Sequence, residues 1–133
     1  MLPAGAARNA IDCALWDLEA KRSGRPVWEL AGLERPQPLT TAFTLSVDAP
    51  AAMEAAARAA ADRPLLKLKL TGDGDLERVA AVRRGAPRAR LIVDANEAWT
   101  AAHYASFARD LAGLGVELIE QPLPAGGDGD LAN

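Results

Sequence analysis

The segment Leu65-Leu66-Lys67-Leu68-Lys69-Leu70 alternates apolar and charged side chains in the manner of a β-strand. Successive side chains on a strand point to opposite faces, so Lys67 and Lys69 share one face and the leucines after Leu65 share the other. In an isolated strand this pattern would place the lysines in water. Two later apolar segments favour a different arrangement, because each carries a carboxylate near its end.

These carboxylates are Asp94, at the end of an apolar run beginning at Leu91, and Glu120, at the end of a run beginning at Val116. Lys69, Asp94 and Glu120 recur at nearly equal steps of 25 and 26 residues. Two lysines that face two acids across a sheet indicate a charged site rather than a solvated face.

Strand and helix patterns alternate through the second part of the chain. Strands are predicted over 40–47, 65–70, 90–95 and 116–121, helices over 50–61, 75–85 and 100–112, and a helix start at 128–133. Buried strands joined by helices predict a parallel sheet with right-handed crossovers. Because a glycine-rich phosphate-binding motif is lacking, the α/β repeat fits a (β/α) barrel better than a dinucleotide fold. Four units are present, whereas a closed barrel needs eight.

The first part of the chain is predicted to be helical and separate. Apolar periodicity indicates one helix over 5–22 and a short one over 27–31, and the Glu-Arg-Pro-Gln-Pro segment 34–38 reads as a stiff linker. We therefore expect two domains, 1–34 and 38–133.

Composition narrows the functional classes. The 133 residues carry a net charge of -3, which does not favour a nucleic-acid partner. Cys13 is the single cysteine, so no internal disulfide can form. The sequence shows no signal peptide and no transmembrane span. We expect a cytoplasmic protein with no membrane partner.

The inward faces of the predicted strands end in polar residues. Thr44, Lys69, Asp94 and Glu120 all lie late in their strands, at the edge where barrel enzymes hold their chemistry. Asp94 and Glu120 offer the hard oxygen ligands that Mg²⁺ prefers. A lysine beside such a site is expected to shift toward its neutral form, through burial, the metal and the second lysine. A neutral lysine next to Mg²⁺ suits proton abstraction beside a carboxylate.

Other interpretations stay open on these residues alone. A buried ion-pair network that only holds the strands together fits the spacing equally well. A lyase that uses Lys67 or Lys69 to form a Schiff base is another interpretation. A non-catalytic fragment or interaction module is a further one.

The strand-end motifs resemble those of the enolase superfamily, in its muconate-lactonizing-enzyme-like subgroup. They are Lys67-Leu68-Lys69, Asp94-Ala95-Asn96 and Glu120-Gln121-Pro122. Segments 14–21 and 24–30 are similar to the helices before the barrel in those enzymes, and segment 41–47 most resembles the dipeptide epimerases. The resemblance implies the first half of a TIM-type barrel, preceded by the last helices of an α+β capping domain.

The resemblance also implies roles for the site residues. Lys69 would be the acid/base on one face of the substrate α-carbon, and Lys67 would tune that base and touch the substrate carboxylate. Asp94 and Glu120 would be the first two Mg²⁺ ligands.

Two further positions take implied roles around this site. Asn96 would support the metal site from outside the coordination shell, and Thr44 would lie at the substrate.

The implied activity is Mg²⁺-dependent epimerisation of dipeptides such as L-Ala-D/L-Glu, an isomerase reaction that passes through an enolate. Its partner would be a small dipeptide or other carboxylate, and the full-length enzyme would be a homo-oligomer. Racemase, cycloisomerase and o-succinylbenzoate synthase reactions share the same first step and stay as alternatives. The family's third metal ligand, its opposing lysine, the later acidic motif that grips the dipeptide ammonium and the front of its capping domain are not in this chain. We therefore expect an internal fragment with little or no epimerase activity.

Overall fold

The computed structural model describes residues 2–132 and divides into two units, Met1–Leu39 and Thr40–Asn133. The first unit contains helix α1, Ala6–Ser23, and the short helix α2, Val27–Leu30. Helix α1 is capped at its carboxyl end by Gly24, whose left-handed φ of 67° suits glycine, and Lys21 and Arg22 lie in its last turn. Both helices lie within one residue or so of the ranges that the apolar periodicity predicts.

The second unit alternates strands and helices as the sequence predicts. Its elements are β1 Phe43–Leu45, α3 Pro50–Ala59, β2 Leu65–Lys69, α4 Asp75–Gly85, β3 Arg90–Asp94, α5 Ala101–Gly113, β4 Val116–Glu120 and the 3₁₀ helix η1 Asp128–Ala132. The start of a further helix was expected at 128–133, and the structure has a 3₁₀ turn there instead. The strand expected over 40–47 is reduced to three residues, because hydrogen-bonded pairing with β2 extends only from Phe43 to Leu45.

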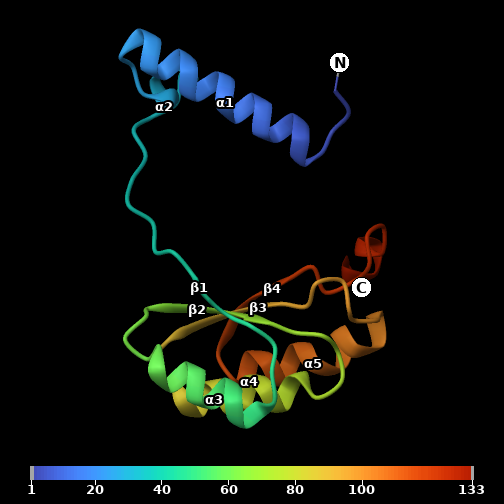
Figure 1. Cartoon of the computed structure of the whole chain (residues 1–133). Coiled ribbons are helices and arrows are strands. Elements are labelled where there is room, and N and C mark those ends of the chain that lie inside the picture. The colour runs from blue at the N-terminus through green and yellow to red at the C-terminus, as the bar shows by residue number, and fades with distance from the viewer. Residues whose placement is uncertain (1, 133) are drawn as a thin grey trace. The chain divides into compact units, whose positions relative to one another are not determined.

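The four strands form one parallel sheet in the order β1-β2-β3-β4. Figure 1 shows α3, α4 and α5 together on one face of this sheet. Right-handed crossovers between neighbouring strands place every helix on the same side, as in a (β/α) barrel, whereas a doubly wound fold has helices on both sides. The α/β class and the barrel-type sheet predicted from the sequence are confirmed.

The core lies between the sheet and these helices. Its largest fully buried apolar side chains come from the strands, from the helices and from the loops that follow β2 and β3: Met53, Leu66, Leu68, Leu70, Val79, Val82, Leu91, Val93, Trp99 and Leu111. Burial of these apolar side chains is the main stabilising contribution to the unit. The lysines of β2 therefore project from the opposite face of the sheet, where they can contact other polar groups.

The last strand departs from simple alternation at one point. Leu91 pairs with Val116 but Ile92 pairs with Leu118, so Glu117 is the extra residue of a β-bulge. Its carboxylate accepts hydrogen bonds from the Arg90 guanidinium at 2.6–3.0 Å. The bulge keeps Leu118 and Glu120 on the face that carries the lysines, as the sequence predicts.

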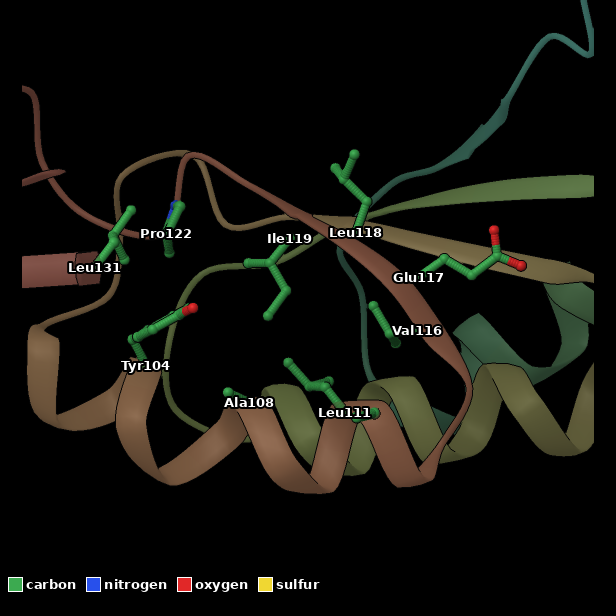
Figure 2. Close-up of a pocket in the computed structure, with 10 residues that line it drawn as sticks. Tyr104, Ala108, Leu111, Val116, Glu117, Leu118, Ile119, Pro122 and Leu131 are labelled. Atoms are coloured by element: carbon green, nitrogen blue, oxygen red, sulfur yellow. The ribbon is translucent and has the colours of Figure 1, made fainter. Parts of the chain in front are cut away.

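The helix-facing side of β4 borders a hollow of 310 Å³ next to α5. Figure 2 shows Ile119 and Leu111 pointing into the space between strand and helix, while Leu118 points to the other face. The hollow lies on the helix side of the sheet, so it is separate from the face that carries the charged residues.

Among residues 2–132, no helix combines the length and the hydrophobicity needed to cross a bilayer.

Candidate active site

Three polar residues form one layer across the carboxyl ends of β2, β3 and β4. Lys69 pairs with Asp94, and Asp94 pairs with Glu120, in the parallel register. Residues that are paired in register on adjacent strands point to the same face, so the three side chains meet. The Nζ of Lys69 lies 2.7 Å from Oδ2 of Asp94. The equal sequence steps between these residues thus correspond to one level of the sheet.

Lys67 reaches this layer from two residues earlier on β2. Its Nζ lies 3.0 Å from Oδ2 of Asp94 and 2.5 Å from Oε2 of Glu120. Both ammonium groups therefore meet at one oxygen of Asp94, and Lys67 also bridges to the neighbouring strand. With two positive and two negative charges, the cluster of Lys67, Lys69, Asp94 and Glu120 is formally neutral. We call these four residues the charged cluster.

Asp94 is the buried centre of the charged cluster, with a side chain only 2% exposed. Burial pushes the pKa of Asp94 upward, but hydrogen bonds from Lys69, from Lys67 and from the backbone N–H of Asn96 outweigh it. The pKa of Asp94 therefore lies below its ordinary value, and the group is a carboxylate at neutral pH.

At Lys67, the expected shift toward the neutral form through burial, the metal and the second lysine is opposed by two carboxylates. Its hydrogen bonds to Glu120 and then to Asp94 raise the pKa of Lys67 above its ordinary value and outweigh the effect of burial. The side chain remains 20% exposed, so its desolvation is moderate. Lys67 is thus held as an ammonium ion by the two carboxylates.

Asn96 and Thr44 occupy different positions relative to the charged cluster. Asn96 lies beyond the end of β3, and its backbone N–H donates to Oδ1 of Asp94 at 3.0 Å. Thr44 pairs in register with Lys67, and its level continues through Ile92 on β3. Thr44 therefore lies one layer below Lys69, toward the amino ends of the strands.

The turns after the charged cluster contain three non-glycine residues with positive φ: Asn96 at 49°, Glu97 at 64° and Gln121 at 43°. Such conformations are uncommon outside glycine and persist where surrounding contacts fix them. Here the N–H of Glu97 donates to the carbonyl of Gln121 at 2.8 Å, which ties the two turns together. The ends of β3 and β4 are therefore fixed to each other beyond the last paired residues.

Sequence reasoning missed the buried carboxylate of Asp75. The pattern Gly-Asp-Gly-Asp predicts Asp75 as a helix N-cap, but Gly74 occupies that position and Asp75 is the first residue of α4. Its side chain instead accepts a hydrogen bond from the indole Nε1–H of Trp99 at 2.8 Å. The two residues are 24 positions apart, and no local pattern pairs them.

The charged cluster offers part of the ligand set of a magnesium site. Mg²⁺ in proteins is commonly held by one or two carboxylates, with waters and substrate oxygens completing the shell, and Asp94 and Glu120 supply two. Throughout residues 2–132, three or more acidic, histidine or cysteine side chains do not gather in one potential metal site. The carboxylates fit the metal chemically, and their ion pairs with Lys67 and Lys69 balance their charge.

Two protein-family models match this chain. Residues 51–133, more than half of the chain, match the model of the family described as enolase C-terminal domain-like. The chain belongs to the enolase C-terminal domain-like family. Residues 1–32 match the mandelate racemase / muconate lactonizing enzyme N-terminal domain.

Relatives within the enolase superfamily are dipeptide epimerases and racemases by name. The chain is 48% identical to N-acetyl-D-glutamate racemase of a Pseudoalteromonas species and 47% identical to L-Ala-D/L-Glu epimerase of Escherichia coli. The matches cover 99% and 100% of the chain but only 42% of each relative. The chain thus spans less than half the length of these relatives.

Solved structures of the enolase superfamily give the same result. An enolase family member from Agrobacterium tumefaciens, solved with sodium and L-Ala-L-Glu, is 49% identical with a TM-score of 0.89 over 99% of the chain and 40% of its own length. A dipeptide epimerase from Enterococcus faecalis, solved with Mg and L-Leu-L-Tyr, is 32% identical with a TM-score of 0.80, covering 92% of the chain and 36% of its own length. The resemblance to the enolase superfamily stated from the sequence motifs is confirmed.

Proposed function

We propose that this chain carries one half of the active site of a Mg²⁺-dependent epimerase that acts on dipeptides such as L-Ala-D/L-Glu. The observation that carries the proposal is the layer of Lys69, Asp94 and Glu120 at the carboxyl ends of three adjacent parallel strands. Barrel enzymes hold their chemistry at this edge. The names of the relatives, together with the dipeptides in their solved structures, support the choice of reaction.

Lys69 is proposed as the group that moves the proton on the substrate α-carbon. Its side chain is 35% exposed on the open face of the sheet, so a substrate can approach Nζ. The contact to Asp94 fixes the ammonium group and orients it. In its neutral form Lys69 would take the α-proton, and in its charged form it would return one.

Lys67 is proposed to hold charge rather than to move a proton. The pKa of this group is raised by Glu120 and Asp94, so it remains cationic at neutral pH. A fixed cation beside the reacting centre would attract the substrate carboxylate. Thr44 and Asn96 are proposed to line the substrate side and to orient Asp94, respectively.

Asp94 and Glu120 are proposed to hold Mg²⁺. The bound cation would stabilise the negative charge that develops on the substrate carboxylate oxygens. Both carboxylates would then exchange part of their contact with Lys67 for contact with the metal.

Epimerisation requires acid/base groups on both faces of one carbon, and we propose that Lys69 serves one face. The second group, the third metal ligand and the substrate cap would come from the part of the relatives that this chain does not match. We also propose that the full-length enzyme is a homo-oligomer, as the family resemblance implies, and that it is cytoplasmic, as expected from the sequence.

The test is a chimera in which this chain replaces the matching segment of the Escherichia coli L-Ala-D/L-Glu epimerase. We expect the chimera, with Mg²⁺ in D₂O, to exchange the α-proton of the glutamate residue and to interconvert L-Ala-L-Glu and L-Ala-D-Glu. Lys69→Met should abolish exchange on one face, and the 133-residue chain alone should give no steady conversion. A folded chimera that exchanges no α-proton would refute the proposed function.

A racemase acting on N-acyl amino acids is the second candidate, favoured by the 48% identity to N-acetyl-D-glutamate racemase. N-acetylglutamate and L-Ala-Glu share an N-acylated glutamate carbon, so Lys69, Asp94 and Glu120 would serve both. The same chimera and the unaltered Escherichia coli epimerase, each assayed with N-acetyl-D-glutamate and with L-Ala-L-Glu, test this candidate. A ratio of kcat/KM values that this chain shifts toward N-acetyl-D-glutamate would favour the racemase, and an unchanged ratio would not.

A further inference from the structure

Asp75 is a buried carboxylate that lies outside the charged cluster. It is 0% exposed and belongs to the first turn of α4. Its Oδ2 accepts hydrogen bonds from the backbone N–H of Gly72 at 2.7 Å and from the indole of Trp99 at 2.8 Å. The N–H of Thr71 lies 3.2 Å from both oxygens, and Arg78 donates to Oδ1 at 2.9 Å. One carboxylate therefore binds both the β2–α4 loop and the β3–α5 loop.

These two loops leave the sheet directly after site residues. Leu70 follows Lys69, and its N–H donates to the carbonyl of Asp94 at 2.9 Å. At the other loop, the backbone N–H of Trp99 donates to the carbonyl of Pro122 at 3.0 Å, just beyond the end of β4. The Asp75–Trp99 hydrogen bond thus connects the carboxyl ends of β2, β3 and β4, which are the three strand ends that carry the charged cluster.

Trp99 is held firmly enough to act as such a connection. It is 1% exposed and packs edge-on against Phe107, with ring centroids 5.3 Å apart and an interplanar angle of 84°. The turn that precedes it contains Asn96 and Glu97, both in the left-handed region. Backbone in that region relaxes unless its surroundings fix it, and the hydrogen bond from Trp99 to Asp75 is one of the contacts that do so.

We propose that Asp75 is a positioning residue for the active site: its hydrogen bonds to Gly72 and Trp99 hold the loops so that Lys69 and Asp94 keep their contact. The catalytic meaning of this inference rests on the proposed function, whereas its geometry does not. Asp75 would act through the backbone, since it touches neither Lys69 nor the carboxylates of the charged cluster. The competing explanation is that Asp75 stabilises the unit as a whole with no special effect on the strand ends.

The experiment compares Trp99→Phe and Asp75→Asn with Met53→Ala in the ¹⁵N-labelled 133-residue chain. Trp99→Phe removes the indole N–H but keeps a ring against Phe107, and Met53 is a buried core residue of α3, outside the two loops that Asp75 joins. Two NMR signals are followed: hydrogen exchange at the Leu70 N–H, and the ammonium signal of Lys69, whose protons exchange slowly with water only while Nζ is hydrogen-bonded. Both report the strand ends directly.

We expect Trp99→Phe and Asp75→Asn to speed hydrogen exchange at the Leu70 N–H by at least about tenfold, the lower end of the range that one hydrogen bond to a charged group corresponds to. Both variants should also broaden or remove the Lys69 signal. Met53→Ala should lower global stability but keep both signals. If Asp75→Asn does not fold, Trp99→Phe decides. Unchanged signals in Trp99→Phe, equal changes in Met53→Ala, or unfolding of Trp99→Phe would each overturn the proposal. Neither signal needs a metal or a substrate, so failure of the proposed epimerase activity would not alter this test.

Discussion

Replacing Lys67 by methionine tests the electrostatic balance of the charged cluster. The variant removes the ammonium group that lies 3.0 Å from Asp94 and 2.5 Å from Glu120, while methionine keeps most of the apolar length of the side chain. Asp94 keeps Lys69 as a partner. Lys69→Met is the matched control, because it removes one contact to Asp94 and leaves the bridge from Lys67 to both carboxylates intact.

The expected magnitude follows from burial. Removing one partner of a fully buried ion pair costs about 3–5 kcal/mol. The side chain of Lys67 is 20% exposed and that of Glu120 is 40% exposed, so water offsets part of this cost. We expect Lys67→Met to lower the free energy of unfolding by about 2–3 kcal/mol and Lys69→Met by about 1 kcal/mol. For a unit of this size, the first change corresponds to a drop in Tm of roughly 10–20 °C.

The difference should depend on pH in a defined direction. The pKa of Asp94 is lowered on folding, so its stabilising contribution is present above about pH 3.8 and is lost as the pH falls through the folded-state value. The pKa of Lys67 is raised, so its contribution is present below about pH 10.5 and is lost above the folded-state value. The gap between the parent chain and Lys67→Met should be wide at neutral pH and should close in strong acid.

The assay is thermal unfolding followed by circular dichroism, at pH 7 and at acidic pH, with chelator present to exclude divalent cations. The ranking of the two variants at neutral pH is the decisive result. If Lys67→Met is as stable as Lys69→Met, or if the gap persists after the carboxylates are protonated, the bridging role of Lys67 is wrong.

Three further substitutions test contacts outside the charged cluster. Arg83 donates hydrogen bonds to the carbonyls of Ala89 and Leu114 at 2.7 and 2.8 Å. Arg83→Met should therefore lower the free energy of unfolding, measured by urea denaturation, by about 2 kcal/mol. The control is Arg84→Met, which removes an exposed guanidinium and should lower it by less than about 1 kcal/mol. A Cβ at Gly85 would collide with a backbone carbonyl of α3, so G85A should cost about 1–3 kcal/mol in the same assay, and an unchanged midpoint would contradict the close packing of α3 on α4. Arg90 lowers the pKa of Glu117, so an NMR titration of R90M should show that pKa rising toward 4.5; an unchanged value would mean that the bidentate pair is not formed in solution.

Much of the site could be predicted, because the periodicity of a strand determines the face to which each of its side chains points. The alternation around Lys67 and Lys69 fixes their common face, and parallel pairing converts the even spacing of Lys69, Asp94 and Glu120 into one layer. The face of Leu118 and Glu120 was also predicted correctly, even though the bulge at Glu117 interrupts the strand before them. Local pattern is sufficient wherever a side chain's direction follows from the backbone alone.

Contacts between distant side chains could not be predicted in the same way. The bond between Asp75 and Trp99 depends on how two loops pack, and the local pattern around Asp75 indicated a helix cap instead. The direction of the Lys67 pKa shift depends on the distances from its Nζ to two carboxylates, whereas the expectation from the sequence considered burial, the metal and the second lysine. The bulge at Glu117 likewise needs knowledge of its pairing with β3.

The central claim is that Asp94 and Glu120 supply two of the protein ligands of a Mg²⁺ site. A Mg²⁺ titration of the ¹⁵N-labelled chain tests it, because the N–H of Asn96 donates to Asp94 and senses a cation bound there. We expect the Asn96 signal to shift saturably with Mg²⁺, and Asp94→Asn or Glu120→Gln to weaken or abolish that shift. No saturable shift in the parent chain, or a shift that survives in both variants, would contradict the assignment of the site.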